Sequence, residues 1–217
     1  MIIGISGKKQ HGKDLIGEII QYLTHPSKYK SFKNYQKNSI KQNSGWRIVK
    51  FADKLKDIVC LLLGCTREQL EDDNFKNKEV GDEWRGWYYD ELTLNPRVFL
   101  QYIGTDLFRN NFHPNTWVNA MMSDYKGTVY VDGHSANEVY SKWLITDVRF
   151  ENEAQAIKQR GGVLIRVNRP SIKSNDMHES EIALDQFTGF DYVITNNGSI
   201  DDLIIQVKDI LVKEKIL

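Results

Sequence analysis

Apolar positions along the chain fall into short continuous runs and longer stretches with helical spacing. The run over residues 1–6 ends in glycines, and residues 13–23 place their apolar side chains on one helical face. Further strands are predicted at residues 46–52, 142–146, 163–167 and 191–195. Because strands alternate with helices, we expect an α/β fold with a parallel sheet covered on both faces.

Capping residues mark where several helices begin or end. Gly64 ends a predicted helix, Thr66 with Gln69 fits a capping box, and Asn95 with Pro96 opens a helix that runs to about residue 110. Helices are also predicted over residues 117–125, over 151–160 and after Ser199. No regular element is assigned to the acidic and aromatic residues 71–94.

We expect one domain over residues 1–217, with two inserts. Residues 25–45 are polar and poorly periodic, which predicts an insert or a mobile loop. Residues 126–141 contain a hairpin signal around Asp132 and Gly133.

Charge and cysteine content restrict the class of protein. Lys+Arg and Asp+Glu are equal at 29 each, so the chain lacks the excess positive charge expected of a protein that binds polymeric nucleic acid. No segment reaches the length of a membrane span, and no leader is evident, so we expect a cytoplasmic protein. Cys60 and Cys65 lie in an apolar stretch and are predicted to be reduced core thiols.

The segment between the first strand and the first helix has the pattern of a phosphate-binding loop. Gly7 and Gly12 stand five residues apart and Lys13 follows. Glycines let backbone N–H groups curl around phosphate oxygens, and the lysine reaches the β- and γ-phosphates. The alternative is a glycine turn with an ordinary surface lysine. The predicted phosphate-binding residues are Gly7, Lys9, Gln10, His11, Gly12, Lys13, Asp14 and Leu15.

Asp14 stands where such loops usually carry a serine or threonine that ligates Mg²⁺. Its carboxylate could ligate the ion directly or through water, or could cap the helix. His11 is expected to contribute its backbone N–H, because phosphoryl transfer depends chiefly on positioning and charge neutralisation.

A second group of polar residues recurs every four positions on the helix that begins at Pro96. Arg97, Gln101 and Thr105 share a predicted face, followed by Arg109. Arginine forks suit phosphate, although incidental arginines on an exposed helix would look the same. Trp117 could stack on a base or simply pack.

The strand at residues 142–146 ends in Asp147, followed by Arg149 and Glu153. In this fold class an acid at such a position lies near the metal or the acceptor, whereas the alternative is a helix cap beside a surface arginine. The cluster Asp176, His178, Glu179 and Glu181 could suggest a metal site, but a solvated mobile segment is favoured. Residues 169–185, with flanking basic residues, could close over the phosphates as a lid.

Taken together, these residues make the chain similar to the phage deoxynucleoside monophosphate kinases. The matching stretches run in order through Ser6-Gly7, Gly12-Lys13-Asp14, Phe51-Ala52-Asp53, Leu55-Lys56, Gln101, Gly104-Thr105-Asp106, Asn110-Asn111-Phe112, Trp117-Val118, Thr146-Asp147-Val148-Arg149-Phe150, Asn152-Glu153, Lys173-Ser174-Asn175-Asp176, His178 and 191–199. At one position the chain differs from part of this family, because Gln10 stands where some members have a basic residue.

The resemblance implies a three-layer P-loop fold of the nucleoside-monophosphate-kinase type, transfer from ATP to a dNMP, and Mg²⁺ as cofactor. It places Lys13, Arg97, Asp147 and Arg149 in catalysis and Asp14 at the metal. It implies that the dNMP is bound by Lys9, Arg97, Gln101, Gly104, Thr105, Asn111, Trp117, Asp147, Arg149 and Glu153. Alternatives are a P-loop kinase for another phosphorylated metabolite and an ATP-binding regulatory protein without an acceptor; a homodimer is left open.

Overall fold

The computed structural model describes residues 1–37, 44–84, 94–132, 135–172 and 178–217. The chain divides into two compact units: unit 1 comprises residues 1–50 and 125–217, and unit 2 comprises residues 51–124. The expectation of one kinase domain over the whole chain stays a prediction, because two compact units can belong to one folding domain or to two.

Unit 1 is built on a five-stranded sheet in the order β2-β5-β1-β6-β7, and every neighbouring pair in it is parallel. The strands are β1 (Ile2–Ser6), β2 (Trp46–Val49), β5 (Lys142–Val148), β6 (Val163–Asn168) and β7 (Tyr192–Thr195). All five strands were predicted from apolar runs, and the parallel α/β class is confirmed.

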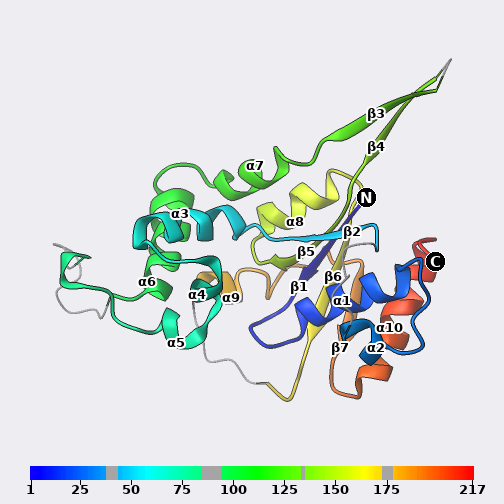
Figure 1. The fold of residues 1–217 in the computed structure, drawn as a ribbon, viewed down its shortest axis with the longest axis horizontal. Coiled ribbons are helices and arrows are strands. Elements are labelled where there is room, and N and C mark those ends of the chain that lie inside the picture. Colours follow the sequence, from blue (N-terminus) through cyan, green and yellow to red (C-terminus); the bar gives the residue numbers. More distant parts are fainter. Residues whose placement is uncertain (38–43, 85–93, 133–134, 173–177) are drawn as a thin grey trace. The chain divides into compact units, whose positions relative to one another are not determined.

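Helices cover both faces of this sheet (Figure 1). α1 (Lys13–Thr24) and α10 (Ile200–Lys213) pack on one face, and α8 (Glu151–Lys158) packs on the other. Successive residues of β1 face opposite sides of the sheet, so this strand contacts both helix layers. Ile3 and Ile5 point to the α1 side, whereas a Cβ at Gly4 would lie 2.6 Å from Ile157 of α8.

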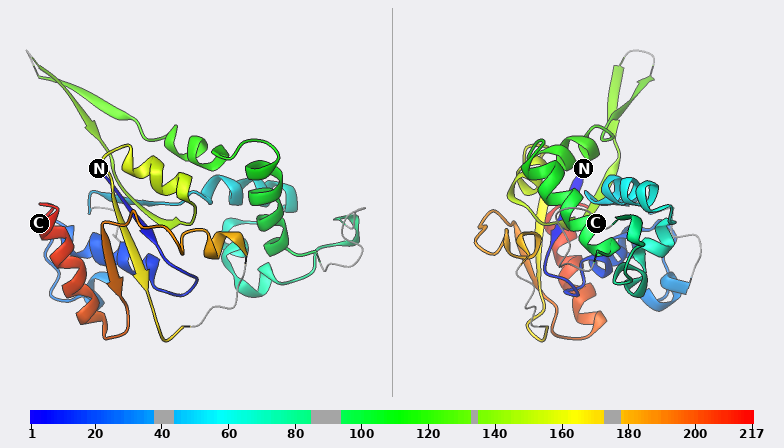
Figure 2. Two further views of the ribbon diagram at one scale, coloured as in Figure 1. Left: turned by 180° about the vertical axis from the view of Figure 1, so that it is seen from behind. Right: turned by 90° about the vertical axis from the view of Figure 1, so that its left-hand side faces the viewer.

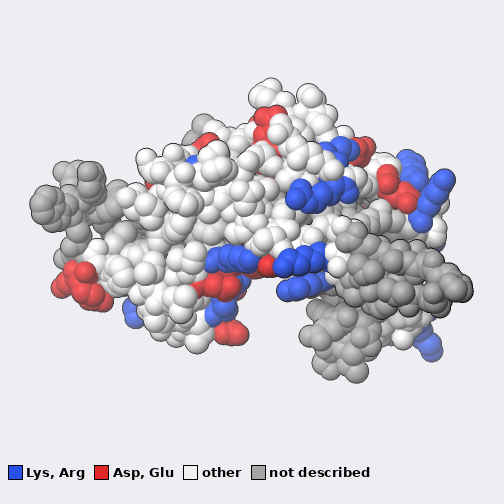
Figure 3. All heavy atoms as spheres, turned by 90° about the horizontal axis from the view of Figure 1, so that it is seen from above, with Lys and Arg blue, Asp and Glu red and all other residues white. Residues whose placement is uncertain are grey.

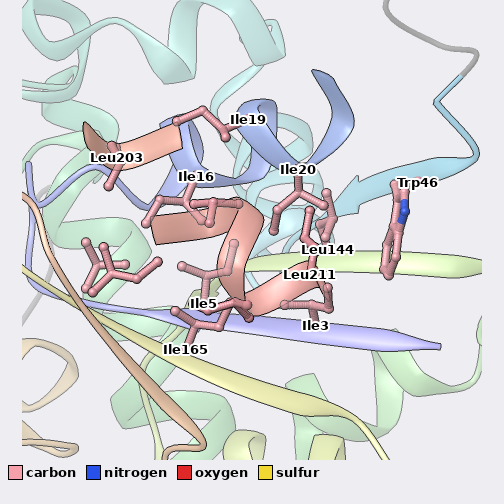
Figure 4. Packing of buried hydrophobic residues seen from close by; sticks show 14 of the residues in the cluster. Ile3, Ile5, Ile16, Ile19, Ile20, Trp46, Leu144, Ile165, Leu203 and Leu211 are labelled. Carbon is pink, nitrogen blue, oxygen red and sulfur yellow. The ribbon is translucent and has the colours of Figure 1, made fainter. Parts of the chain in front are cut away.

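The core between the sheet and α1 consists almost entirely of branched aliphatic side chains (Figure 4). Ile16, Ile19 and Ile20 recur along one face of α1 and are fully buried. They meet the sheet and α10 through Ile3, Ile5, Leu144, Ile165, Leu203 and Leu211. Burying each of these side chains contributes about 1.5–3 kcal/mol, so this layer fixes the start of α1 and the loop before it.

Residues 25–45 combine an irregular, largely exposed stretch before Phe32 with one short helix in their described part, and their status as an insert stays a prediction. They contain α2 (Phe32–Lys37), and Phe32 and Tyr35 are buried in the same core as α1. Tyr22, Phe32 and Tyr35 form an aromatic cluster with ring centroids 5.4–6.2 Å apart. Phe32 and Tyr35 stand three residues apart, so they lie on the same face of α2 and bury their rings although the segment as a whole is polar. Residues 38–43 lie outside the described residues.

The predicted hairpin is confirmed as β3 (Gly127–Asp132) and β4 (Ser135–Tyr140), which pair antiparallel. Figure 2 shows the two strands extending as a ribbon beyond the five-stranded sheet. The predicted turn at Gly133 lies outside the described residues.

Unit 2 is helical in its described part, with a core formed by Leu55, Val59, Leu70, Leu94, Phe99, Ile103 and Trp117. Its helices are α3 (Asp53–Leu63), α4 (Arg67–Glu71), α5 (Asp73–Lys76), the 3-10 turn η2 (Asp82–Trp84), α6 (Pro96–Gln101), the π-helix η3 (Tyr102–Asn110) and α7 (Thr116–Met122). The predicted caps at Gly64, Thr66 and Asn95 are confirmed. Cys60 and Cys65 are free thiols.

The sequence predicted one helix from Pro96 to about residue 110. The structure has a helix over this range, but only its first part, α6, is α-helical. From Tyr102 the hydrogen bonds span five residues, and Asn111 N donates to Asp106 O. Because a turn closed by hydrogen bonds that span five residues contains between four and five residues, side chains four apart stay close to one direction, and the recurrence of Gln101, Thr105 and Arg109 on one face is kept.

On the face drawn in Figure 3, described side chains of both charges are visible, with lysine and arginine in blue and aspartate and glutamate in red. Within the described ranges, no helix has the length and apolar character needed to cross a bilayer.

Candidate functional site

The loop between β1 and α1 lies where a parallel sheet of this kind offers a binding crevice. β1 is the central strand, with β5 on one side and β6 on the other. The connections that leave β1 and β5 run toward opposite edges of the sheet, and ligands bind at the carboxyl end of strands at such a switch point. Residues 7–12 follow directly from this end of β1.

Both loop glycines occupy positions that a side chain could not share. A Cβ at Gly7 would lie 2.7 Å from the Val167 carbonyl oxygen. Gly12 has φ +97°, and a Cβ there would lie 2.7 Å from Asn196 Nδ2. Gln10 also adopts a left-handed φ of 65°. The backbone therefore turns tightly before entering α1, as a phosphate-binding loop requires.

The loop is tied to the ends of β6 and β7. His11 is buried, and its Nδ1 lies 3.2 Å from Val167 O and 3.3 Å from the backbone nitrogen of Arg169. Asn196 Nδ2 donates to His11 O over 3.0 Å. The imidazole thus anchors the loop, while the predicted role of its backbone N–H stays a prediction. Leu15, another predicted phosphate contact, packs its side chain against the core.

Lys13 points back over the loop. Its ammonium donates to the carbonyl oxygens of Gly7 at 2.6 Å and Lys8 at 2.9 Å. Burial lowers the pKa of Lys13 to about 8, and the charge of Arg149 acts in the same direction. Glu181, Asp14 and Asp147 oppose this shift with their negative charges. The lysine therefore stands among one arginine and three carboxylates, all of unit 1.

Asp14 is held in place through one of its two oxygens. Thr146 Oγ1 donates to Asp14 Oδ1 over 2.6 Å, and Lys50 Nζ lies 2.9 Å from the same atom. Shielding from solvent acts to raise the pKa of Asp14, but the hydrogen bonds from Thr146 and Lys50 hold this pKa below its ordinary value. Two-thirds of the side chain is exposed, so an ionised carboxylate remains accessible to a ligand.

Arg149 is held by α9 (Glu179–Ile182). Its guanidinium NH1 donates to Glu181 Oε1 and lies 3.4 Å from the carbonyl oxygen of Ser180. The other carboxylate oxygen, Glu181 Oε2, accepts the backbone N–H of Lys9 over 2.9 Å. Burial acts to raise the pKa of Glu181, but Arg149, the Lys9 N–H and Lys13 keep this pKa below its ordinary value.

Glu181 therefore corrects the expectation of a solvated mobile segment at this point. Its side chain is 6% exposed, because α9 turns it against the loop. Glu181 stood out in the sequence only as a member of a suggested metal cluster, and its contact with Lys9 has no local signal because the two residues are 172 positions apart. Asp176, also part of the suggested metal cluster, lies outside the described residues, as do residues 173–177 of the predicted lid.

Glu153 is buried and supports the backbone at Arg149, and its predicted role in binding the dNMP stays a prediction. It is 2% exposed, and its Oε2 accepts the backbone N–H of Arg149 at 2.8 Å and of Phe150 at 3.1 Å. This geometry caps α8 and fixes the backbone that carries Arg149.

Six of the residues predicted to bind the acceptor lie in unit 2, and most of these six have partners there. Arg97 Nε donates to Asn77 Oδ1 over 3.0 Å, and its NH2 lies 3.1 Å from Asp73 Oδ1. α5 thus brings a carboxylate, Asp73, to the polar face predicted for this helix. The pair is largely exposed, and exposed ion pairs contribute only about 0.2–1 kcal/mol, so Arg97 can exchange partners.

Trp117 and Gly104 contact one another. Trp117 Nε1 donates to the Gly104 carbonyl over 2.8 Å, and the indole is 5% exposed with an edge-to-face contact to Phe108. A Cβ at Gly104 would lie 2.7 Å from Leu55. Packing thus accounts for both residues, so their role in binding a nucleotide stays a prediction.

The other polar residues predicted on this helix lie in the π-helix η3 or at its two ends. Thr105 and Arg109 are buried, Gln101 is partly buried, and Asn111 uses its side chain to donate to Asp106 O over 2.7 Å. π-helical turns are rare in proteins and are frequent at functional sites, so the segment remains a candidate for binding.

Among the described residues, no group of three or more His, Cys, Asp or Glu side chains could hold a metal ion. This does not argue against Mg²⁺, which is commonly held by one or two carboxylates together with substrate phosphates and water. Asp14, with Asp147 in the same cluster, fits that pattern.

Comparison with known proteins places this geometry in a family. The family model described as deoxynucleotide monophosphate kinase matches residues 87–207. A protein of Acanthamoeba polyphaga mimivirus, to which this activity is provisionally assigned, is 33% identical over 72% of this chain and 78% of its own length.

Two phage enzymes are also similar. The deoxynucleotide monophosphate kinase of Enterobacteria phage T4 is 36% identical over 53% of this chain and 44% of its own length. That of Escherichia phage RB69 is 30% identical over 55% of this chain and 46% of its own length, so each match spans less than half of the phage enzyme. With a family match over more than half of its residues, the chain belongs to the deoxynucleotide monophosphate kinase family.

Proposed function

We propose that this protein transfers the γ-phosphoryl group of ATP to a deoxynucleoside monophosphate, giving ADP and a dNDP. The observation that carries the proposal is the cluster around the loop in unit 1, where the Lys13 ammonium rests on the carbonyl oxygens of Gly7 and Lys8 and is acted on by the charges of Asp14, Asp147 and Arg149. The names of the mimivirus and phage relatives support the choice of acceptor.

In the proposed mechanism, backbone N–H groups of residues 7–13 hold the triphosphate and Lys13 compensates the charge on its β and γ oxygens. The ammonium already rests on two carbonyls of the loop, Gly7 O and Lys8 O, so it needs only a short movement to reach a phosphate. Lys9, Gln10 and His11 contribute through the backbone of this loop, and Leu15 contributes through its backbone N–H in the first turn of α1.

The transfer itself is a direct displacement. An oxygen of the acceptor phosphate forms a bond to the γ-phosphorus as the bond from that phosphorus to the β-γ bridging oxygen breaks. The acceptor is already anionic near neutral pH, so no base is required, and Asp147 orients rather than deprotonates. Arg149 stabilises the transferring charge.

Mg²⁺ would be held by Asp14 together with phosphate oxygens and would neutralise charge on those oxygens. Thr146 and Lys50 contribute by orienting the Asp14 carboxylate, as partners of metal ligands commonly do.

Acceptor recognition is assigned to unit 2, through Arg97, Gln101, Gly104, Thr105, Asn111 and Trp117, and to Lys9, Asp147, Arg149 and Glu153 of unit 1. Arg97 would exchange Asp73 for a phosphate, which offers its guanidinium two parallel hydrogen bonds. Glu153 acts by holding the backbone of Arg149. We retain the cytoplasm as the expected location of the reaction.

The test is to incubate the protein with ATP, Mg²⁺ and each of the dNMPs in turn, and to measure ADP and dNDP. We expect ADP to form in equal amount with a dNDP for at least one base. Formation of ADP without any response to a monophosphate would favour an ATP-binding regulatory protein. Transfer only to another phosphorylated metabolite would favour a different P-loop kinase.

A further inference from the structure

The carboxylate of Glu181 lies on donors that the proposed reaction assigns to phosphate. One of its oxygens accepts the N–H of Lys9, inside the phosphate loop, at 2.9 Å. The other accepts a hydrogen bond from Arg149 NH1. Its charge also acts on the Lys13 ammonium. A backbone amide of the loop, an arginine and the loop lysine are the groups that bind a phosphate oxygen in such a site.

The carboxylate is built into this position rather than resting there by chance. The side chain is 6% exposed, and α9 is fixed at its start by His178, whose Nδ1 accepts the N–H of Ser180 over 3.2 Å. Arg149 also approaches the Ser180 carbonyl oxygen, so the arginine contacts α9 twice. Burial of a carboxylate is unfavourable unless it is paired, and here Lys9 and Arg149 supply the pairing.

We propose that Glu181 is an internal anion that occupies the phosphate-binding groups of the ligand-free enzyme and that ATP must displace it. The inference rests on the proposed function, because it concerns the same loop. A phosphate has more negative charge than a carboxylate and more oxygens to accept hydrogen bonds, so it takes over Lys9 N–H and Arg149 when it binds. Displacement leaves the Arg149 guanidinium directed at phosphate.

The energetic consequence is a trade between stability and affinity. Whatever Glu181 contributes to the ligand-free fold is subtracted from the binding of ATP, because binding requires the state in which the carboxylate has left. A residue with a merely structural role would show the opposite pattern, since its removal would weaken both the fold and the site.

The test is Glu181→Gln, with Glu179→Gln as the matched control. Glu179 stands two residues earlier on the exposed side of α9, so its variant removes the same charge from the same helix. Calorimetric titration with a non-hydrolysable ATP analogue and with tripolyphosphate measures binding without catalysis, and thermal melting measures stability.

We expect Glu181→Gln to bind both ligands about 3- to 10-fold more tightly, the gain expected when the carboxylate occupies the site for two-thirds to nine-tenths of the time. The melting temperature of the ligand-free variant should fall, and Glu179→Gln should change neither quantity. Unchanged or weaker binding of either ligand by Glu181→Gln would overturn the inference.

Two further measurements keep the test decisive. If Glu181→Gln fails to fold, Glu181→Asp shortens the side chain by one methylene and should tighten binding in the same direction by a smaller factor; weaker or equal binding would again count against the idea. A wild-type protein that binds neither ligand would instead contradict the proposed function, so the two failures are distinguishable.

Discussion

In unit 1, the polar residues that stood out in the sequence act on one another around a single loop, whereas in unit 2 most of the corresponding residues have structural partners. Lys13 is influenced by Asp14, Asp147 and Arg149. In unit 2, by contrast, Trp117 donates to Gly104 and Arg97 pairs with Asp73. In the proposed function, ATP enters a loop whose charged residues already surround it and displaces Glu181 alone, whereas Arg97 must exchange Asp73 for the acceptor phosphate.

The largest expected effect comes from removing the loop lysine. Lys13→Met should lower kcat by a factor of about 10²–10³, the loss typical of deleting one donor that stabilises transition-state charge. The melting temperature should change little, because burial already disfavours the ammonium at this position. Steady-state kinetics and thermal melting measure the two effects.

The control is Lys8→Met, which removes a neighbouring loop lysine that pairs with Asp185 over 2.8 Å. It should stay within a few-fold of wild-type activity. A Lys13→Met variant that keeps full activity would remove the basis for assigning the triphosphate to unit 1.

Arginine 97 offers the sharpest test of unit 2. Arg97→Ala should raise the KM for dNMP by about tenfold or more, as expected when a charge-assisted hydrogen bond to a phosphate is lost. Asp73→Asn keeps the arginine and removes its partner, so it should leave the KM unchanged or lower it. Equal rises in KM for both variants would mean that Arg97 acts only through its pair with Asp73.

We expect the dissociation constant for ATP to depend on pH, with a rise of up to about tenfold per pH unit above the pKa of Lys13. With a pKa of about 8, Lys13 loses its proton in the free enzyme as the pH rises above that value. ATP favours the ammonium, so its dissociation constant should increase above pH 8 and stay nearly level just below it. Titrations from about pH 7 to about pH 10 measure this trend.

Lys13→Arg serves as the matched variant, because arginine stays charged over that range. Whatever affinity it retains should lose this pH dependence. An ATP dissociation constant that is flat for the wild-type protein across the whole range would contradict the assigned role of the lysine.

The smallest effect on activity is expected at Trp117. Trp117→Phe removes the donor to the buried Gly104 carbonyl, which should lower the free energy of unfolding by about 1–3 kcal/mol. Because phenylalanine keeps an aromatic ring at this position, the KM for dNMP should rise by no more than a few-fold. Chemical denaturation and kinetics give the two values. A KM that rises with no loss of stability would instead support stacking of the indole on a base.

The same comparison explains how far the sequence could predict the structure. Short-range signals were reliable: the apolar runs, the glycines of the loop and the caps at Thr66, Asn95 and Ser199 are confirmed. Each of these signals depends on residues within one turn or one strand, so the local sequence contains the whole cause.

Long-range partners could not be predicted in this way. The pairing of Lys50 with Asp14 and of Glu181 with Lys9 and Arg149 depends on which strands and helices become neighbours. The change from α- to π-helix at Tyr102 likewise could not be predicted, because no single residue type marks it. The roles of the site residues therefore stay proposals.

The most direct measurement of the central claim is calorimetric binding of each substrate alone to the wild-type protein and to Lys13→Met and Arg97→Ala. The account predicts that Lys13→Met loses affinity for a non-hydrolysable ATP analogue by at least about tenfold while keeping its affinity for dNMP, and that Arg97→Ala does the reverse. Two results would contradict this account. One is a Lys13→Met variant that binds the ATP analogue as tightly as the wild-type protein, and the other is an equal loss of affinity for both ligands in each variant.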